Sequence, residues 1–161
     1  MIYVRPAGGQ DWRFVITAAE RLAAFGPPDW RPAREIVAAE VRTLEAFFAS
    51  PPAGSALYVA EAKGGERLGF MYLERVEDYF TLEAHAHVGM LVVAEQAEGR
   101  GVGSRLMRWA ENWAREQGYR RLTLNVFEGN RRARAAYERL GYRAETLRYV
   151  KMLDEGPGGA D

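Results

Sequence analysis

The residues with the clearest chemical potential in this chain are three closely spaced glycines in the stretch LVVAEQAEGRGVGSRLM, residues 91–107. Gly99, Gly101 and Gly103 stand between an apolar run and a segment with helical spacing. A turn that presents successive backbone N–H groups just before a helix N-terminus binds anions. Side chains would block that approach, which favours glycine despite its conformational entropy. The alternative is a tight strand-to-helix turn that binds nothing.

The spacing of these glycines fits two common phosphate loops poorly. A dinucleotide fingerprint needs G-x-G-x-x-G, whereas the third glycine of GRGVGS, residues 99–104, comes one residue early. A P-loop needs a lysine after its second glycine, and the stretch contains none. The site, if it binds an anion, is therefore of another kind.

A second group of polar residues lies at the start of the strand expected over about 85–93. Glu83, His85 and His87 share the same parity, so a regular strand projects them to one side. A histidine with an ordinary pKa near 6.5 can accept a proton at neutral pH. The alternative is a polar strand end. Two histidines at i and i+2 without a third clear ligand are too few for a metal site, and we predict no metal.

Composition limits the classes of function. The chain has 161 residues, of which 48% are hydrophobic and 27% charged, and this predicts one soluble domain. Lys+Arg and Asp+Glu are both 22, so no overall field favours nucleic acid or a membrane as partner. The absence of cysteine excludes disulfides and thiol nucleophiles. No signal-peptide pattern or long apolar run is present, and we expect a cytoplasmic protein.

Hydrophobic periodicity and turn residues predict ten elements in the order β-α-α-β-β-β-α-β-α-β. Asp11 is expected to cap the first helix, and Asn130 the last. The fold class is therefore α/β of the α+β type, a mixed, mostly antiparallel sheet flanked by helices in a single domain over 1–153. Residues 154–161 are expected to be a disordered tail. The expected strands are 2–7, 56–62, 67–76, 85–93, 121–127 and a closing strand over 142–153.

Two motifs resemble the GNAT superfamily of N-acetyltransferases. The segment Gln96-Ala97-Glu98-Gly99-Arg100-Gly101 is similar to the family's acetyl-CoA loop, Q/R-x-x-G-x-G/A, between a central strand and a helix. The later segment LNVFEGNRRARAAYERLGY, residues 124–142, resembles a second family motif in the spacing of its Asn, Ala, Tyr and Gly-aromatic positions. The expected element order agrees over nearly the whole chain, from Ile2 to Leu153.

The resemblance implies acetyl-CoA as the acetyl donor. Backbone amides from Gly99 to Ser104 would hold its pyrophosphate, with Arg100 and Arg105 adding charge. The strand at Leu91–Val93 would pair with the pantetheine arm, and Asn130 would hydrogen-bond to it. The implied cofactor-binding residues are Leu91, Val92, Val93, Gln96, Gly99, Arg100, Gly101, Val102, Gly103, Ser104, Asn130 and Tyr137.

The resemblance also implies catalytic residues. Tyr137 occupies the position of a family tyrosine that protonates the departing thiolate, and the resemblance favours this role over the core packing that its apolar neighbours alone would indicate. His85 falls where some members carry a catalytic Glu. The family's other base position holds Asn125, whose amide cannot act as a base. His85, Glu83 or a water molecule therefore remain as alternatives.

The implied function is direct transfer of an acetyl group to a primary amine of a small molecule, peptide or protein. The loop FGPPDWRP, residues 25–32, would help shape the acceptor site, where Asp29 and Trp30 could seat a cationic amine. One alternative is a non-catalytic acetyl-CoA or CoA sensor, and another is a mononucleotide-binding protein. A homodimer is left open.

Overall fold

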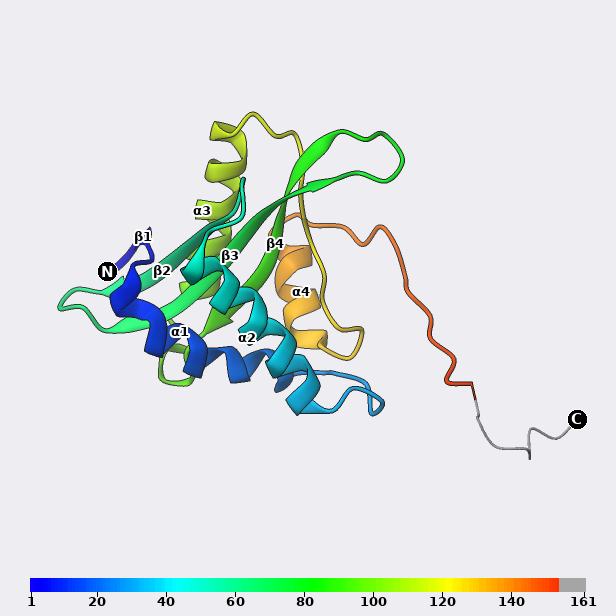
Figure 1. The fold of residues 1–161 in the computed structure, drawn as a ribbon, viewed down its shortest axis with the longest axis horizontal. Helices are drawn as coiled ribbons and strands as arrows, with labels where there is room; N and C mark the ends of the chain where they lie inside the picture. The colour runs from blue at the N-terminus through cyan, green and yellow to red at the C-terminus, as the bar shows by residue number, and fades with distance from the viewer. Residues whose placement is uncertain (154–161) are drawn as a thin grey trace, which may run out of the picture.

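A single five-stranded sheet forms the centre of the computed structural model, which describes residues 1–153 (Figure 1). The tail predicted over 154–161 lies outside the described residues. Neighbouring strands follow the chain order β1-β2-β3-β4-β5. Successive pairs are antiparallel except β4 and β5, which are parallel. The strands are β1 (Ile2–Pro6), β2 (Ala56–Ala62), β3 (Arg67–Glu77), β4 (Ala84–Val93) and β5 (Leu122–Leu124).

Helices cover both faces of the sheet, as the expected fold class requires. One face carries α1 (Trp12–Ala18), the short 3₁₀ helix η2 (Ala19–Ala23) and α2 (Ala33–Ala49). The other face carries α3 (Val102–Glu116), and α4 (Arg131–Arg139) follows β5. Two further 3₁₀ turns are η1 (Gly9–Asp11) and η3 (Glu95–Ala97). No helix among the described residues is both long enough and apolar enough to cross a bilayer.

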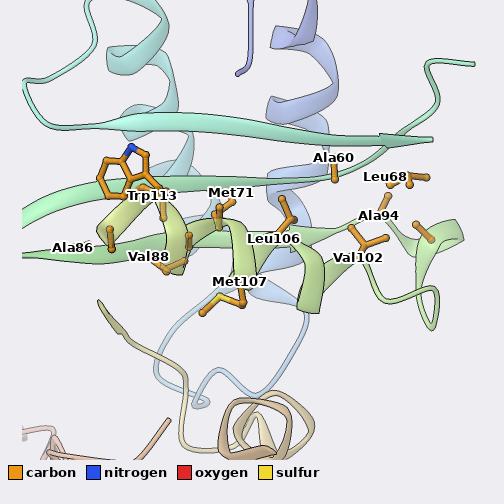
Figure 2. Close-up of a cluster of buried hydrophobic side chains, with 14 residues drawn as sticks. Ala60, Leu68, Met71, Ala86, Val88, Ala94, Val102, Leu106, Met107 and Trp113 are labelled. Atoms are coloured by element: carbon orange, nitrogen blue, oxygen red, sulfur yellow. The ribbon is translucent and has the colours of Figure 1, made fainter. Parts of the chain in front are cut away.

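Alternation along β3 builds a separate core on each face. Met71 and Leu73 pack with Leu106 and Met107 of α3, in the cluster shown in Figure 2. Phe70 and Tyr72, one residue out of step, pack toward α1 and α2. Because successive side chains of a strand point to opposite faces, a nearly continuous apolar run can fill both cores. These two cores hold β3 and β4 rigidly at the centre of the sheet.

A β-bulge changes the direction of side chains halfway along β4. Tyr72 pairs with Met90 but Leu73 pairs with Val88, so Gly89 is an extra residue in β4. Val88 belongs to the α3-side core, whereas Met90 belongs to the core beneath α1 and α2. The residues that alternate with Ala86 and Val88 therefore face the α1 and α2 side. Among them are both histidines of the chain.

Asp11 does not cap α1 through its side chain, contrary to the prediction. Its carboxylate is fully buried and accepts hydrogen bonds from Arg5 at 2.8 and 2.9 Å, and from the Arg67 Nε at 2.7 Å. The backbone N–H of Gly8 donates a further bond at 2.8 Å. The bonds from Arg5 lower the pKa of Asp11 more than burial raises it. A buried carboxylate needs such partners, and this one ties β1 and β3 to the start of α1.

The prediction of a closing strand over 142–153 is wrong for this chain. Those residues form no ladder with any described strand, and the last part of the described chain, orange to red in Figure 1, runs away from the body. Local β-favouring residues such as Tyr149 and Val150 indicate an extended backbone, but they do not specify a partner strand. The edge strand β5 has three residues, which is too short to secure a long neighbour.

Candidate functional site

The glycine loop joins η3 to α3 through two residues in the left-handed region. Gly99 has φ 76° and Gly101, the N-cap of α3, has φ 80°. Other residues rarely adopt this conformation, so the turn itself requires glycine at both positions. Gly103 lies inside the helix, where an added Cβ would make an ordinary 3.7 Å contact with Val93. Its glycine is therefore not needed for the backbone conformation.

The first turn of α3 presents its N–H groups without a side-chain cap from the described residues. Three arginines, Arg100, Arg105 and Arg108, line a cavity of about 500 Å³ at this end of the helix, together with Ser104. Arg100 lies 3.8 Å from Glu66, and both side chains are half exposed. The helix N-terminus and the arginines make this corner suited to phosphates. Arg108 was not predicted from the sequence, although its spacing of three from Arg105 indicates a shared helix face.

The cavity opens between α3 and β1, while the other functional edge lies across the sheet on β4. β4 pairs with β5 only over Ala86–Val88, so no described strand lies beside Leu91–Val93 on that side. The Arg21 Nε donates to the Val93 carbonyl at 2.7 Å, and Arg21 also pairs with Glu98 of the glycine loop. Leu91, Val92 and Val93 were predicted to pair with the pantetheine arm, and the carbonyl of Val93 already accepts a hydrogen bond from Arg21. Leu91 and Val92 border the open edge.

The start of α4 lies against the loop that precedes α2. The Asn130 side chain accepts a hydrogen bond from Ala133 N at 3.2 Å, which confirms the predicted cap. Gly26 has φ 74°, and a Cβ there would overlap the backbone of Gly129 and Asn130. This close approach brings the 25–32 loop, with the exposed Trp30, to the N-terminus of α4.

Tyr137 is half buried against the α3-side core, where its ring meets Tyr142 edge-on at 6.1 Å between centroids. Burial raises the pKa of Tyr137 above 10, so the phenol carries its proton at neutral pH. A phenol in this state can donate a proton or a hydrogen bond. The linings of the two cavities described here do not include Tyr137, and the histidines lie in a different cavity from the arginines.

The two histidines meet at one hydroxyl. The His85 Nε2 lies 3.1 Å and the His87 Nδ1 2.8 Å from the Oγ1 of Thr123 on β5. His85 is 7% exposed, and its Nδ1 has no partner among the described residues. Burial and then the charge of His85 lower the pKa of His87, which leaves His87 neutral at pH 7. A neutral imidazole hydrogen-bonded to a hydroxyl can accept a proton.

Thr123 was not identified from the sequence, although the parallel register His87–Thr123 between β4 and β5 explains the contact. The cluster lines a cavity of about 380 Å³ on the open part of the sheet. Glu83 lies outside it: its side chain is exposed and 4.0 Å from Arg120. The cavity is lined by Val76, Glu77, Asp78, Tyr79, Phe80, His85, His87, Thr123, Asn125, Glu145 and Thr146.

Two further carboxyl groups near this cavity were also missed. Glu74 pairs with His87 across β3 and β4, and an added Cβ on Gly89 would lie 2.8 Å from its Oε2. Burial raises the pKa of Glu74. Burial and the charge of Glu74 also raise the pKa of Glu40 on α2. No periodicity in the sequence brings a residue of α2 together with one of β3. Among residues 1–153 no group of three metal-ligating side chains occurs.

Known proteins share the sequence pattern and the fold of this chain. The model of the acetyltransferase (GNAT) family matches residues 20–142, and the chain belongs to that family. A chain from Pyrococcus furiosus described as an acetyl transferase superposes with a TM-score of 0.77 at 23% identity, covering 95% of this chain and all of that one. At this identity the structural likeness shows the fold.

Sequence relatives carry N-acetyltransferase names. The uncharacterized N-acetyltransferase YhfO of Bacillus subtilis (strain 168) is 33% identical over 92 residues, which are 57% of this chain and 61% of that protein. The aminoglycoside N(6')-acetyltransferase type 1 of Stenotrophomonas maltophilia is 33% identical over 104 residues, 62% of this chain and 68% of that protein. The chain thus spans about three-fifths of the length of YhfO.

Proposed function

We propose that the protein is an N-acetyltransferase that moves the acetyl group of acetyl-CoA directly to a primary amine. The observation that carries the proposal is the dual use of β4. Its C-terminal end leads through an open edge into the glycine loop, and its N-terminal end carries two histidines into a separate cavity. A donor along the open edge and an acceptor from the cavity would meet on one rigid strand.

The donor's phosphates fit the glycine loop. The N–H groups of the first turn of α3 and the charge of Arg100 and Arg105 would hold them. The unpartnered edge at Leu91–Val92 offers backbone groups to the amides of the pantetheine arm, and Asn130 lies at the start of α4 nearby. Gln96 lies in η3, which precedes the loop.

The acceptor amine must be neutral before it attacks, because an ammonium has no lone pair. The new C–N bond forms as the C–S bond of the thioester breaks, and the amine loses one proton while the sulfur gains one. His87, linked through Thr123 to His85, would receive the amine's proton. Tyr137 keeps a proton that it can supply to the sulfur.

The lining of the histidine cavity favours a cationic amine. Glu77 and Glu145 are among the residues that line the cavity, and Glu74 pairs with His87 across β3 and β4. Asp78 contributes less, since its carboxylate already pairs with Arg121 at 2.9 Å and accepts bonds from its own turn. The S. maltophilia relative is named as an aminoglycoside acetyltransferase, which agrees with a small cationic substrate.

The second candidate is a sensor that binds acetyl-CoA without transferring it. It is supported by the separation of Tyr137 from the histidine cavity in this structure. A thiol-release assay with acetyl-CoA and a panel of polyamines, aminoglycosides and peptides separates the two. We expect amine-dependent release of CoA, with a polycation giving the highest kcat/KM. Calorimetric binding of acetyl-CoA without release for any amine would support the sensor instead.

A further inference from the structure

Arg21 in η2 reaches from the connection between α1 and α2 to the end of β4. Its Nε donates to the Val93 carbonyl at 2.7 Å, and the same guanidinium forms an ion pair with Glu98 of the glycine loop. The guanidinium also lies over the ring of Phe25, 5.3 Å from the ring centroid. The Arg21 side chain is 22% exposed, so water screens these contacts only in part. One planar group therefore contacts the strand, the glycine loop and the start of the 25–32 loop.

The Val93 carbonyl points toward the open edge of the sheet. The next residue, Ala94, donates its N–H to the Leu68 carbonyl at 2.8 Å, on the side of β3. Backbone groups of successive residues in an antiparallel strand point to alternate sides, so those of Val93 point away from β3. Leu91, two residues earlier, presents its backbone groups to the same edge. Arg21 thus lies at the end of the edge along which the pantetheine arm of the donor is proposed to bind.

An arginine suits this position because its donors are fixed in one plane. The Nε donates to the carbonyl of β4 while the Nη2 binds the carboxylate of Glu98, so the guanidinium fixes the end of the strand relative to the glycine loop. Glu98 also lies 4.0 Å from Arg132 near the start of α4. The carboxylate therefore stands between two cations, one from the segment before α2 and one from α4.

The 25–32 loop begins beside this contact and is held at its root. Phe25 lies against the guanidinium of Arg21. The next residue, Gly26, leaves no room for a Cβ against the backbone of Gly129 and Asn130. Farther along the loop, the side chain of Trp30 is 43% exposed. A change in the position of the Arg21 guanidinium would therefore reach the loop through Phe25.

We propose that Arg21 is a positioning residue that couples the binding of the donor to the order of the 25–32 loop. The inference rests on the proposed binding of acetyl-CoA, but it does not require acetyl transfer. Phosphates at the first turn of α3 bring negative charge beside Glu98, and this charge favours the state in which the guanidinium bridges Val93 and Glu98. The loop is then more ordered with donor bound. By linkage, an occupant that the ordered loop holds raises the affinity for the donor by the same factor.

Hydrogen exchange with and without CoA tests the coupling. CoA is the probe because it carries the phosphates and the pantetheine arm but has no acetyl group to transfer. In the wild type, saturating CoA should slow the exchange of the 25–32 loop amides roughly fivefold, the low end of typical coupling between two sites. In Arg21→Gln, calorimetry should show CoA binding about tenfold more weakly, because hydrogen bonds from a charged group are lost. At saturating CoA the loop of this variant should exchange as fast as without CoA.

Three further variants serve as controls. Arg13→Gln changes an exposed arginine of the neighbouring helix α1 and should match the wild type in both measurements. Glu98→Gln removes the carboxylate and leaves the carbonyl contact of Arg21, so it should weaken the response of the loop. This variant tests the coupling even if the melting temperature shows that Arg21→Gln does not fold. Arg21→Lys keeps the charge without the planar fork and should recover part of the affinity for CoA, but not the full response of the loop.

The outcomes separate this inference from the proposed function. If CoA does not bind to the wild type, the proposed function and the coupling are both wrong. If CoA binds but leaves the exchange of the 25–32 loop unchanged, the coupling alone is wrong. The same conclusion follows if the loop of Arg21→Gln responds to CoA as fully as that of the wild type.

Discussion

Thr123 has one hydroxyl hydrogen for two histidine nitrogens. Its Oγ1 lies 3.1 Å from His85 and 2.8 Å from His87, so if it donates to one ring it accepts from the other. The tautomers of the two histidines are therefore coupled. A proton received by His87 can be followed by a shift through Thr123 toward His85. This arrangement makes the pair, rather than either residue alone, the candidate base.

Thr123→Val removes the hydroxyl and keeps the shape. We expect kcat/KM at neutral pH to fall roughly tenfold, a part of the 10²–10⁴ that general acid–base catalysis supplies. Thr123→Ser keeps the hydroxyl and should retain most activity, with melting temperatures confirming that β5 is intact. Because the pKa of His87 is lowered, the wild-type pH–rate profile should rise with pH through a group below 6.5 and then level off. Persistence of that limb in both His87→Asn and His85→Ala would remove the histidines from the mechanism.

Tyr137→Phe tests whether this phenol supplies the proton to the departing sulfur. We expect kcat to fall about 10²-fold, the lower end of the range for general acid–base catalysis, with acetyl-CoA affinity nearly unchanged. The reason is that the sulfur needs a proton only as the thioester breaks. Tyr142→Phe alters the neighbouring phenol in the same aromatic pair and should leave kcat nearly unchanged. Equal, small effects in both variants would indicate that Tyr137 contributes packing alone.

At the scale of elements, the glycines before and within α3 have different requirements. One is needed for the backbone conformation, and the other would matter only to a bound ligand. Gly101 needs its left-handed φ, whereas Gly103 has ordinary helical surroundings and space for a Cβ. Gly103→Ala should therefore leave stability almost unchanged. Any weakening of acetyl-CoA binding in that variant reports the approach of the ligand to the helix.

Gly101→Val combines both effects. The strained φ should cost on the order of 1–3 kcal/mol of stability, and the displaced N–H groups should weaken acetyl-CoA binding by at least tenfold. Chemical denaturation measures the first effect and calorimetry the second. An unchanged affinity in folded Gly101→Val would show that this loop does not hold the phosphates.

The helices and strands also show how much of the fold could be predicted from the sequence. Hydrophobic periodicity and turn residues predicted β1 to β5 and α1 to α4, and Asn130 was predicted as a cap because capping is local. The bulge at Gly89 and the meeting of Thr123 with both histidines depend on strand register, which no local pattern encodes. Glu40 and Glu74 come together through packing of α2 on the sheet.

At the scale of the whole molecule, the buried carboxylate of Asp11 fixes the first helix to the sheet. Asp11→Asn would leave Arg5 and Arg67 without their charge partner, and we expect a loss on the order of 3 kcal/mol in unfolding free energy. Urea denaturation measures it. Asp29→Asn, in the exposed 25–32 loop, should change stability little.

The buried carboxylate of Asp11 also determines how the free energy of unfolding changes with pH. The pKa of Asp11 is lower in the folded than in the unfolded chain, where it is near 3.9. Its stabilisation is therefore fully present above pH 4 and is lost as the pH falls toward the folded value. The wild type should lose stability below pH 4 more steeply than Asp11→Asn. Parallel stability curves for the two proteins in acid would contradict this role.

The bulge at Gly89 has a consequence for changes in chain length. It puts the two halves of β4 out of phase, so that His85 and His87 share a face with Met90 and Val92 although an odd number of positions separates them. Deleting Gly89 would restore even alternation. Either the imidazoles would point into the hydrophobic core beneath α3, or Met90 and Val92 would leave the hydrophobic core beneath α1 and α2. Point substitutions at the histidines alter chemistry one residue at a time, whereas a single deletion here exchanges inside for outside along half a strand.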